Sequence, residues 1–316
     1  MKKILKIIRI YLSKDTDMKS NASDIHLTFF GSGPVAADSL EFLAAHFTVD
    51  IIITKETSRK EMALLAPSAS IYTVENKADL TQLIINTAPQ TPVGVIVDFG
   101  IIVEKSVIDH FPKGIINSHF SLLPKWRGAD PITFTVLNGE AKTGVSIMLI
   151  NEKLDEGLLL SQQELAVGDQ ETTPSLTKKL ITLSNSMLLS VIPLYLDGET
   201  EPYPQSNTSK ATYSRKLTKQ DGKLDWNKSA TVLEKEIRAY EGWPKSYTSF
   251  KDIPVIITKA HKVTDSVAVG QIKVIDNQLI VGCQDSALAI DTLKPAGKKE
   301  MDSRAFLAGY RQKLGL

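Results

Sequence analysis

Apolar positions recur with two different spacings along the first two-thirds of the chain. Short apolar runs predict strands, and apolar residues repeated every three or four positions predict the helices between them. The predicted strands cover 25–30, 48–54, 93–97, 114–117 and 144–150, and the predicted helices cover 34–46, 78–87, 104–110, 131–138 and 174–196. Strands that alternate with helices imply an α/β domain with a doubly wound, mostly parallel sheet.

The last third of the chain follows a different pattern. The segment 199–212 is rich in Pro, Ser, Asn and Thr and lacks apolar periodicity, so it reads as a linker. Beyond it we predict one helix at 230–240 and short strands at 247–250, 255–259, 271–275, 278–281 and 287–292, which together indicate a small β-barrel. The predicted organisation is an N-terminal extension (1–24), an α/β domain (25–198), the linker (199–212) and a C-terminal barrel (213–316).

The composition fits this organisation and narrows the class of protein. A chain of 316 residues, 42% hydrophobic and 23% charged, is ordinary for a globular protein of two domains. Cys283 is the single cysteine, which excludes an intrachain disulfide and a zinc site built on paired thiolates, and it fits the reducing cytoplasm. The sequence lacks an unbroken apolar run of about 18 residues, so we expect no contact with a membrane.

Charge is distributed unevenly along the chain. Residues 1–204 carry 18 basic and 24 acidic side chains, whereas residues 205–316 carry 19 and 12. A basic C-terminal third is consistent with binding to a polyanion, and chance is the alternative interpretation.

The first 17 residues are basic and amphipathic. Lys6 and Arg9 interrupt the apolar stretch that a secretory signal would need. A helix on a membrane surface is one interpretation. We favour a disordered or mis-started extension with Met18 as the functional start, because the first predicted strand begins only at Ile25.

A glycine-containing turn follows the first predicted strand. Gly31 and Gly33, with Ala36 after them, match the loose pattern of a dinucleotide-binding turn, and Glu56 stands where a ribose ligand would be expected. Pro34 removes one of the backbone N–H donors that a pyrophosphate would use. A dinucleotide-dependent oxidoreductase is therefore an open hypothesis that rests on this turn.

The most informative segment is 114–132, which reads GIINSHFSLLPKWRGADPI. Its strand places Asn117 and His119 at the C-terminal end, where open α/β sheets bind ligands, and the i, i+2 spacing directs both side chains to one face. An amide beside an imidazole can stabilise an oxyanion while the imidazole handles a proton. Asp155 follows another predicted strand, and a carboxylate facing the imidazole would orient it and stabilise its charged form. From these residues alone, a polar strand cap and an ordinary acidic loop remain open.

Together these motifs resemble a known family. The run Asn117-x-His119-x-Ser121-Leu122-Leu123-Pro124, the nearby Arg127-Gly128 and the stretches 143–148 (TGVSIM) and 154–157 (LDEG) are similar to the folate-dependent formyltransferases. Further stretches resemble the methionyl-tRNA formyltransferases within that family. They are 211–213 (ATY), 221–226 (DGKLDW), 238–240 (RAY), 243–244 (WP), 295–301 (PAGKKEM) and 306–307 (FL). The resemblance runs in order from about residue 25 to the C-terminus.

The resemblance implies a fold and an activity. It implies a Rossmann-like formyltransferase domain joined to a barrel of the oligonucleotide-binding type. The implied reaction transfers a formyl group from 10-formyltetrahydrofolate, as donor substrate and without a metal, to the α-amine of initiator methionyl-tRNA for translation initiation. The implied partners are this tRNA and folate, and the implied state is a cytoplasmic monomer.

The resemblance also implies roles for individual residues. Asn117 and a protonated His119 would hold the developing oxyanion, and Asp155 would sustain the imidazolium and accept or relay the proton of the amine. The residues implied to border the folate are Ser121, Leu122, Leu123, Pro124, Phe99 and Gly100, with 95–102 as one wall of the pteridine pocket.

The chain departs from the family at two places that affect substrate recognition. The usual Ala-Tyr-Gly after the fourth strand is Asp98-Phe99-Gly100, and the long basic tRNA-contacting loop is replaced by the short region 54–70 with Lys55, Arg59 and Lys60. Two alternatives therefore stay open beside the oxidoreductase: a formyltransferase acting on an amino-sugar nucleotide, and a folate-binding protein without catalysis.

Overall fold

The computed structural model describes residues 22–316, which form two compact units. The first unit comprises residues 22–117 and Leu189–Glu201, and the second comprises Ser118–Leu188 and Pro202–Leu316. The predicted basic N-terminal stretch lies outside the described residues, and of the predicted extension only Ala22–Asp24 is described, as a short 3-10 helix.

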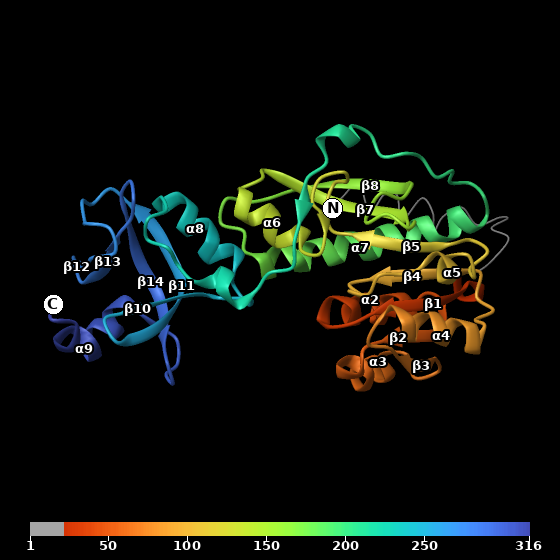
Figure 1. The fold of residues 1–316 in the computed structure, drawn as a ribbon, viewed down its shortest axis with the longest axis horizontal. Helices are drawn as coiled ribbons and strands as arrows, with labels where there is room; N and C mark the ends of the chain where they lie inside the picture. Colours follow the sequence, from red (N-terminus) through yellow and green to blue (C-terminus); the bar gives the residue numbers. More distant parts are fainter. Residues whose placement is uncertain (1–21) are drawn as a thin grey trace. The chain divides into compact units, whose positions relative to one another are not determined.

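The first unit is built on a parallel sheet (Figure 1). Its strands lie in the order β3-β2-β1-β4-β5, and every described pairing between neighbours is parallel. All five residues of β4 are buried, as expected for a strand covered on both faces. The bounds are β1 (His26–Gly31), β2 (Thr48–Thr54), β3 (Ser70–Thr73), β4 (Val93–Val97) and β5 (Ile115–His119), the last two residues of β5 belonging to the second unit.

Helices cover both faces of this sheet. The helices are α2 (Pro34–Ala44), α3 (Arg59–Leu65), α4 (Lys77–Thr87) and α5 (Lys105–Ile108). Right-handed crossovers place α2 and α3 on one face and α4 and α5 on the other, and the observed packing of α2 on α3 and of α4 on α5 agrees. The predicted doubly wound sheet is confirmed. Its strand order reverses between β1 and β4, where such sheets bind ligands.

The second unit begins with a helix and an antiparallel hairpin. Helix α6 (Pro131–Asn138) starts with proline at its first turn and ends at Gly139, whose φ of 62° is favourable for glycine. Strands β7 (Lys142–Leu149) and β8 (Leu159–Ala166) pair in antiparallel register. The loop between them carries Asp155.

Helix α7 (Thr173–Leu196) is the longest helix of residues 22–316. Among these residues it is the one helix long and apolar enough, by length and composition, to cross a membrane, but half of its most apolar stretch is buried inside the protein. Within the second unit, Ser184 on α7 exchanges a 2.6 Å hydroxyl hydrogen bond with Ser118 on β5. This bond ties the helix directly beneath the strand end that carries His119.

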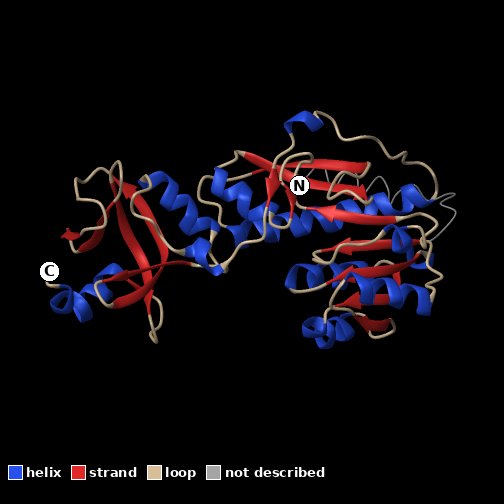
Figure 2. Ribbon diagram, viewed as in Figure 1, coloured by secondary structure: helices blue, strands red, loops and turns tan. Residues whose placement is uncertain are grey.

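The C-terminal part of the second unit is a six-stranded antiparallel sheet (Figure 2). Its strands run β10-β11-β14-β13-β12, with β15 paired to β14. Two register shifts in the β11–β14 pairing curl the sheet around a core centred on Phe306, Leu233 and Ile290. The bounds are β10 (Ser246–Phe250), β11 (Ile253–Val263), β12 (Ile272–Ile275), β13 (Gln278–Gly282), β14 (Ala287–Pro295), β15 (Met301–Asp302), α8 (Ala230–Ala239) and α9 (Ser303–Leu314).

The sequence pattern misses five of these elements: α3, β3, β8, β15 and α9. Helix α3 and the start of β3 lie in the region 54–70, for which no helix or strand is predicted from the sequence. Strand β8 buries only its first two residues and is rich in Gln and Glu, so its pairing with β7 rather than local propensity makes it a strand. Helix α9 has Gly309 in its middle, but Asp302 caps it and Phe306 anchors it in the core.

Candidate active site

Strand β5 carries the predicted amide and imidazole. Asn117 is half-buried and lies in register with Ile96 of β4, and His119 is 6% exposed at the carboxyl end of the strand. Alternate residues of a strand point to the same face, which is the arrangement expected from their spacing. The apolar residues before them bury the strand and so fix the position of its polar end.

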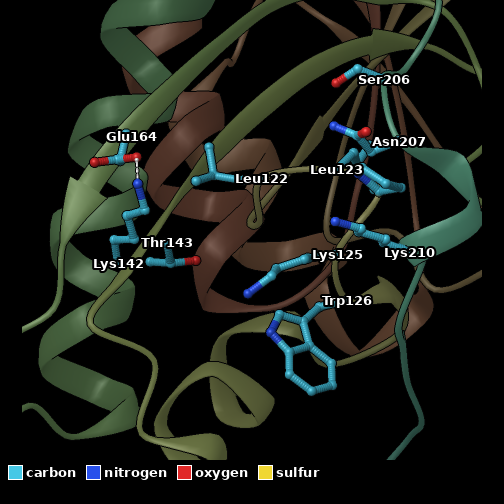
Figure 3. A pocket seen from close by; sticks show the side chains of 11 residues that line it. Leu122, Leu123, Lys125, Trp126, Lys142, Thr143, Glu164, Ser206, Asn207 and Lys210 are labelled. Atoms are coloured by element: carbon cyan, nitrogen blue, oxygen red, sulfur yellow. Dashed lines mark ion pairs between the residues drawn. The ribbon is translucent and has the colours of Figure 1, made fainter.

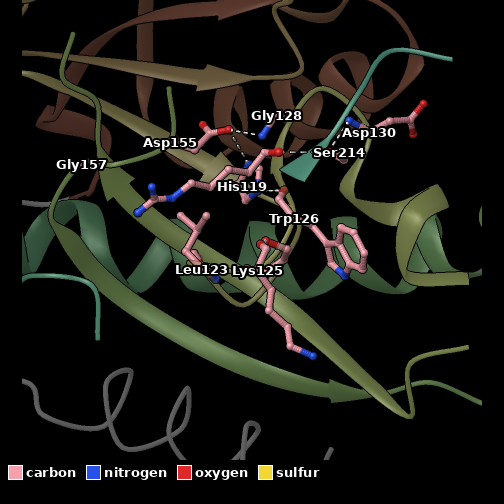
Figure 4. Close-up of polar contacts among 12 residues, drawn as sticks. His119, Leu123, Lys125, Trp126, Gly128, Asp130, Asp155, Gly157 and Ser214 are labelled. Atoms are coloured by element: carbon pink, nitrogen blue, oxygen red, sulfur yellow. Dashed lines mark hydrogen bonds and ion pairs between the residues drawn. The ribbon is translucent and has the colours of Figure 1, made fainter. Parts of the chain in front are cut away.

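His119 contacts acceptor groups at both ring nitrogens (Figure 4). Its Nε2 lies 3.0 Å from the carbonyl oxygen of Trp126, and its Nδ1 lies 3.7 Å from Oδ2 of Asp155. A carbonyl can only accept, so Nε2 carries a proton and donates it. The Nδ1–Oδ2 separation is longer than a hydrogen bond, and an imidazolium would be attracted across it to the carboxylate.

The loop between β7 and β8 places Asp155 for this contact. The carboxylate is nearly buried, and Oδ2 accepts a 2.7 Å hydrogen bond from the backbone N–H of Gly128. The backbone of Asp155 has φ of 52°, a left-handed conformation that Asp tolerates better than most residues. A side chain at Gly157 would meet the carbonyl oxygen of Leu149 at 1.7 Å, so the tight turn requires glycine there.

Two further residues hold this loop. Arg127 is 4% exposed, and its Nη1 donates to Oε1 of Glu156 at 2.7 Å. Gln205 is 9% exposed and donates to backbone carbonyl oxygens of the same loop. In the sequence, Arg127 stands out only as part of the Arg-Gly motif. The sequence offers no signal for Gln205, because it stands in a polar segment and its partners lie about 50 residues away.

Residues 122–126 form part of the lining of a cavity of about 300 Å³, and Asn117, His119 and Asp155 are not among its lining residues (Figure 3). Leu122, Leu123 and Pro124 line it, and Leu123 also packs against Met148 and Leu159. Ser121 is fully buried, and its hydroxyl donates a 2.5 Å hydrogen bond to the carbonyl of Lys125. Its role is therefore to hold the turn, whereas the three residues after it line the cavity.

Three lysines stand around the same cavity. Lys142 pairs with Glu164 at 2.7 Å, and Lys125 pairs with Glu140 at 2.9 Å. Lys210 also lines the cavity and is exposed. Glu164 lines the cavity too, so the cavity has an apolar wall and a rim of mixed charge in which lysines predominate.

Phe99 and Gly100 lie in the first unit. The Phe99 ring is 3% exposed and packs edge-on against Phe30, with ring centroids 5.7 Å apart. Gly100 is exposed and has φ of 68°. The Phe99 side chain is therefore part of the core of the first unit.

The turn after β1 does not support the dinucleotide hypothesis. The backbone N–H of Ser32 donates to the carbonyl of Asp98 at 3.0 Å, and the N–H of Gly33 donates to the hydroxyl of Ser58 at 3.0 Å. Pro34 has no N–H. These three positions therefore offer no free backbone donor to a pyrophosphate.

The described part of the chain, residues 22–316, contains no group of three His, Cys, Asp or Glu side chains that could hold a metal ion. Asp130 lies two residues after Gly128, and its backbone N–H donates to the hydroxyl of Ser214 at 3.1 Å. Burial raises the pKa of the Asp130 carboxyl, although hydrogen bonds to Thr133 partly offset the effect.

The fold and this site define a formyltransferase. Residues 52–192 match the formyl transferase family, and residues 216–311 match the formyl transferase C-terminal domain. The chain is 36% identical to the methionyl-tRNA formyltransferase of Pseudoalteromonas translucida, over 81% of this chain and 80% of that one. It is 30% identical to the enzyme of the same name from Roseiflexus castenholzii, over 91% and 96%. The protein belongs to the methionyl-tRNA formyltransferase family.

A solved structure shares the fold. It is the N-formyltransferase from Helicobacter canadensis, crystallised with folinic acid and dTDP-3-aminofucose. The TM-score is 0.64 at 17% identity, and the match covers 88% of this chain and all of that one. The comparison and the two family matches confirm the predicted fold class of an α/β formyltransferase domain and a separate C-terminal domain. The structure shows the part predicted as a small β-barrel as an antiparallel sheet of β10 to β15.

Proposed function

We propose that this protein transfers the formyl group of 10-formyltetrahydrofolate to the α-amine of methionine carried by initiator tRNA. The contact between His119 and Asp155, 3.7 Å from Nδ1 to Oδ2, carries the proposal. It occurs in a chain that is 36% identical to a named methionyl-tRNA formyltransferase over most of both lengths.

The reaction is acyl transfer through a tetrahedral intermediate. The amine nitrogen attacks the formyl carbon, and the carbonyl oxygen becomes an oxyanion. The bond from that carbon to N10 of the folate then breaks, N10 takes up a proton, and the amine loses one. The protein must therefore stabilise an oxyanion and move a proton between two nitrogens.

The three predicted polar residues suit these two tasks. Asn117 and His119 would donate to the oxyanion, His119 through Nδ1 because the Trp126 carbonyl already occupies Nε2. Asp155 would balance the imidazolium charge and receive the amine proton, since its carboxylate faces the same Nδ1. Donors placed where charge develops typically contribute about 10²–10³ in rate each.

The donor substrate is proposed to lie against the segment that follows β5. Leu122, Leu123 and Pro124 offer an apolar wall. Lys210, together with Lys125, which is paired with Glu140, would attract the carboxylates of a folate tail. Phe99 and Gly100 of the first unit keep their predicted role as residues that border the folate. The proposed site has no resident cofactor, because the folate is consumed as a substrate.

The acceptor tRNA is proposed to be held by the basic C-terminal third of the chain. Residues 205–316 carry 19 basic and 12 acidic side chains, which suits contact with tRNA phosphates. The proposal places the protein in translation initiation in the cytoplasm, acting as a monomer and away from membranes. The domain boundaries predicted from the sequence, with the linker at 199–212, belong to this proposal.

The test is incubation of the full chain with 10-formyltetrahydrofolate and charged initiator methionyl-tRNA, followed by detection of formylmethionine. We expect formylation that depends on both substrates. Parallel reactions contain uncharged tRNA, elongator methionyl-tRNA and an amino-sugar nucleotide. Formylation of the amino sugar without formylation of methionyl-tRNA would replace the proposed acceptor, and folate binding without any transfer would make the protein a non-catalytic binder.

A further inference from the structure

Gln205 is buried, although the other residues from 203 to 210 are exposed. The segment enters through a pair of backbone hydrogen bonds between Tyr203 and Leu159, of 2.8 and 2.9 Å. It leaves through β9 (Tyr213–Ser214), which pairs with β6 (Arg127–Gly128). Gln205 is 9% exposed, while its neighbours Pro204 and Ser206 are exposed. A glutamine buried among exposed neighbours needs partners for its amide.

The amide of Gln205 donates to the active-site loop and accepts from Arg127. Nε2 donates to the carbonyl oxygen of Asp155 at 2.8 Å and to that of Gly157 at 3.1 Å. Oε1 accepts from Nη2 of Arg127 at 2.9 Å. The reversed amide would point its oxygen at two carbonyls and its NH₂ at a guanidinium, so these partners determine its orientation.

Arg127 closes a ring of contacts around the same loop. Its Nη1 binds Glu156 at 2.7 Å, between the two residues that Gln205 holds. The next backbone N–H along the chain, that of Gly128, binds the Asp155 carboxylate. Arg127 and Gly128 thus hold both parts of Asp155. Gly128 bonds the Asp155 carboxylate directly, and Arg127 acts on the Asp155 backbone through Gln205.

Asp155 needs such support. Its left-handed backbone, with φ of 52°, is sparsely populated for residues other than glycine and persists where the surroundings hold it. A small rotation of this backbone would swing the carboxylate away from His119. A misplacement of about 1 Å in an active site can cost about 100-fold in rate.

We propose that Gln205, oriented by Arg127, is a positioning residue for the Asp155 carboxylate. This inference rests on the proposed function. Gln205 acts through the backbone of the Asp155 loop. The segment that contains Gln205, which leads into the basic C-terminal third of the chain, is thereby part of the active-site scaffold.

The test compares Gln205→Ala and the isosteric Gln205→Glu with the full wild-type chain. The Glu variant keeps a partner for Arg127 but loses both donors to the loop carbonyls. The matched control is Gln82→Ala, an exposed glutamine on α4. Formylation is measured as kcat and as KM for each substrate, and thermal melting checks the fold. Amide hydrogen exchange at Gly128 provides a readout that needs no activity, with Ala129, bonded to Ser214 O, as the internal reference.

We expect both variants to lower kcat by about 10- to 100-fold with KM within about twofold, because substrate contacts are kept and only the carboxylate moves. Exchange at Gly128 should accelerate while exchange at Ala129 does not. Unchanged kcat in a folded variant, or a loss carried entirely by KM, would overturn the positioning role. If Gln205→Ala fails to fold, Gln205→Glu decides alone. If the wild type forms no formylmethionine, the proposed function fails, while Gly128 exchange still decides whether Gln205 holds Asp155.

Discussion

The backbone N–H of Gly128 donates a 2.7 Å hydrogen bond to Oδ2 of Asp155, 27 residues further along the chain. The same oxygen faces the imidazole of His119. Gly128 has φ of 109°, and a side chain there would meet the carbonyl oxygen of Ser214 at 2.2 Å. The glycine of the Arg-Gly motif therefore has a structural reason. Only glycine lets β6 approach β9 this closely while its N–H bonds the Asp155 carboxylate.

Replacing Asp155 with Asn should separate charge from shape. An amide can still accept from Gly128, so we expect the fold and folate affinity to be kept. Turnover should fall by at least about 100-fold, because the imidazolium loses its charge partner. The pH profile of kcat should change as well. The measurement is single-turnover formylation across pH, and a normal rate with an unchanged profile would remove Asp155 from the mechanism.

Replacing either His119 or Asn117 with Ala should reduce turnover by at least about 100-fold. The Asn117 variant should keep nearly the melting temperature of the wild type. His119 is buried and bonded to the Trp126 carbonyl, so its loss should also lower stability modestly. The check is single-turnover kinetics alongside thermal unfolding. Rates near those of the wild type in either variant would show that the corresponding residue does not hold the oxyanion.

Binding of methionyl-tRNA should weaken steeply with salt. Lys298 and Lys299 are exposed in the turn between β14 and β15, and each phosphate contact contributes about 0.9 to the slope of log K against log salt. Changing both to Ala should lower that slope by up to about two. Lys178→Ala, an exposed lysine on α7, is the control. A slope unaltered by the double change would place the tRNA elsewhere.

Stability should respond to pH through Glu236. The residue is 7% exposed, Oε1 accepts from Lys228 at 2.5 Å, and Oε2 is buried without a hydrogen-bond partner. Burial raises the pKa of the Glu236 carboxyl, although Lys228 partly counters the effect. A raised folded-state pKa contributes stability below the unfolded-state value near 4.5, and this contribution is lost as pH rises through the folded-state value.

Glu236→Gln should therefore gain stability relative to the wild type as pH rises from 4 to 7. The measurement is the free energy of unfolding in denaturant at both pH values, with Glu241→Gln on the surface as the control for net charge. A difference between Glu236→Gln and wild type that does not vary with pH would contradict the expectation.

The sequence by itself determined the elements with strong periodicity and the residues that carry the resemblance. Strands β2 and β4 and helix α6 begin and end where their apolar patterns predict, because each is buried against a neighbour along its length. The spacing of Asn117 and His119 on one strand follows from strand geometry alone. Asp155 could be selected because its motif is local.

Tertiary structure decided what local pattern could not encode. Strand β8 exists because β7 pairs with it, and Ser121 supports a turn that its motif suggested for ligand contact. Gln205 meets Asp155 across 50 residues of chain and Arg127 across 78. Hydrogen bonds between residues so far apart leave no periodic trace in a sequence, because they depend on where the folded backbone brings each side chain.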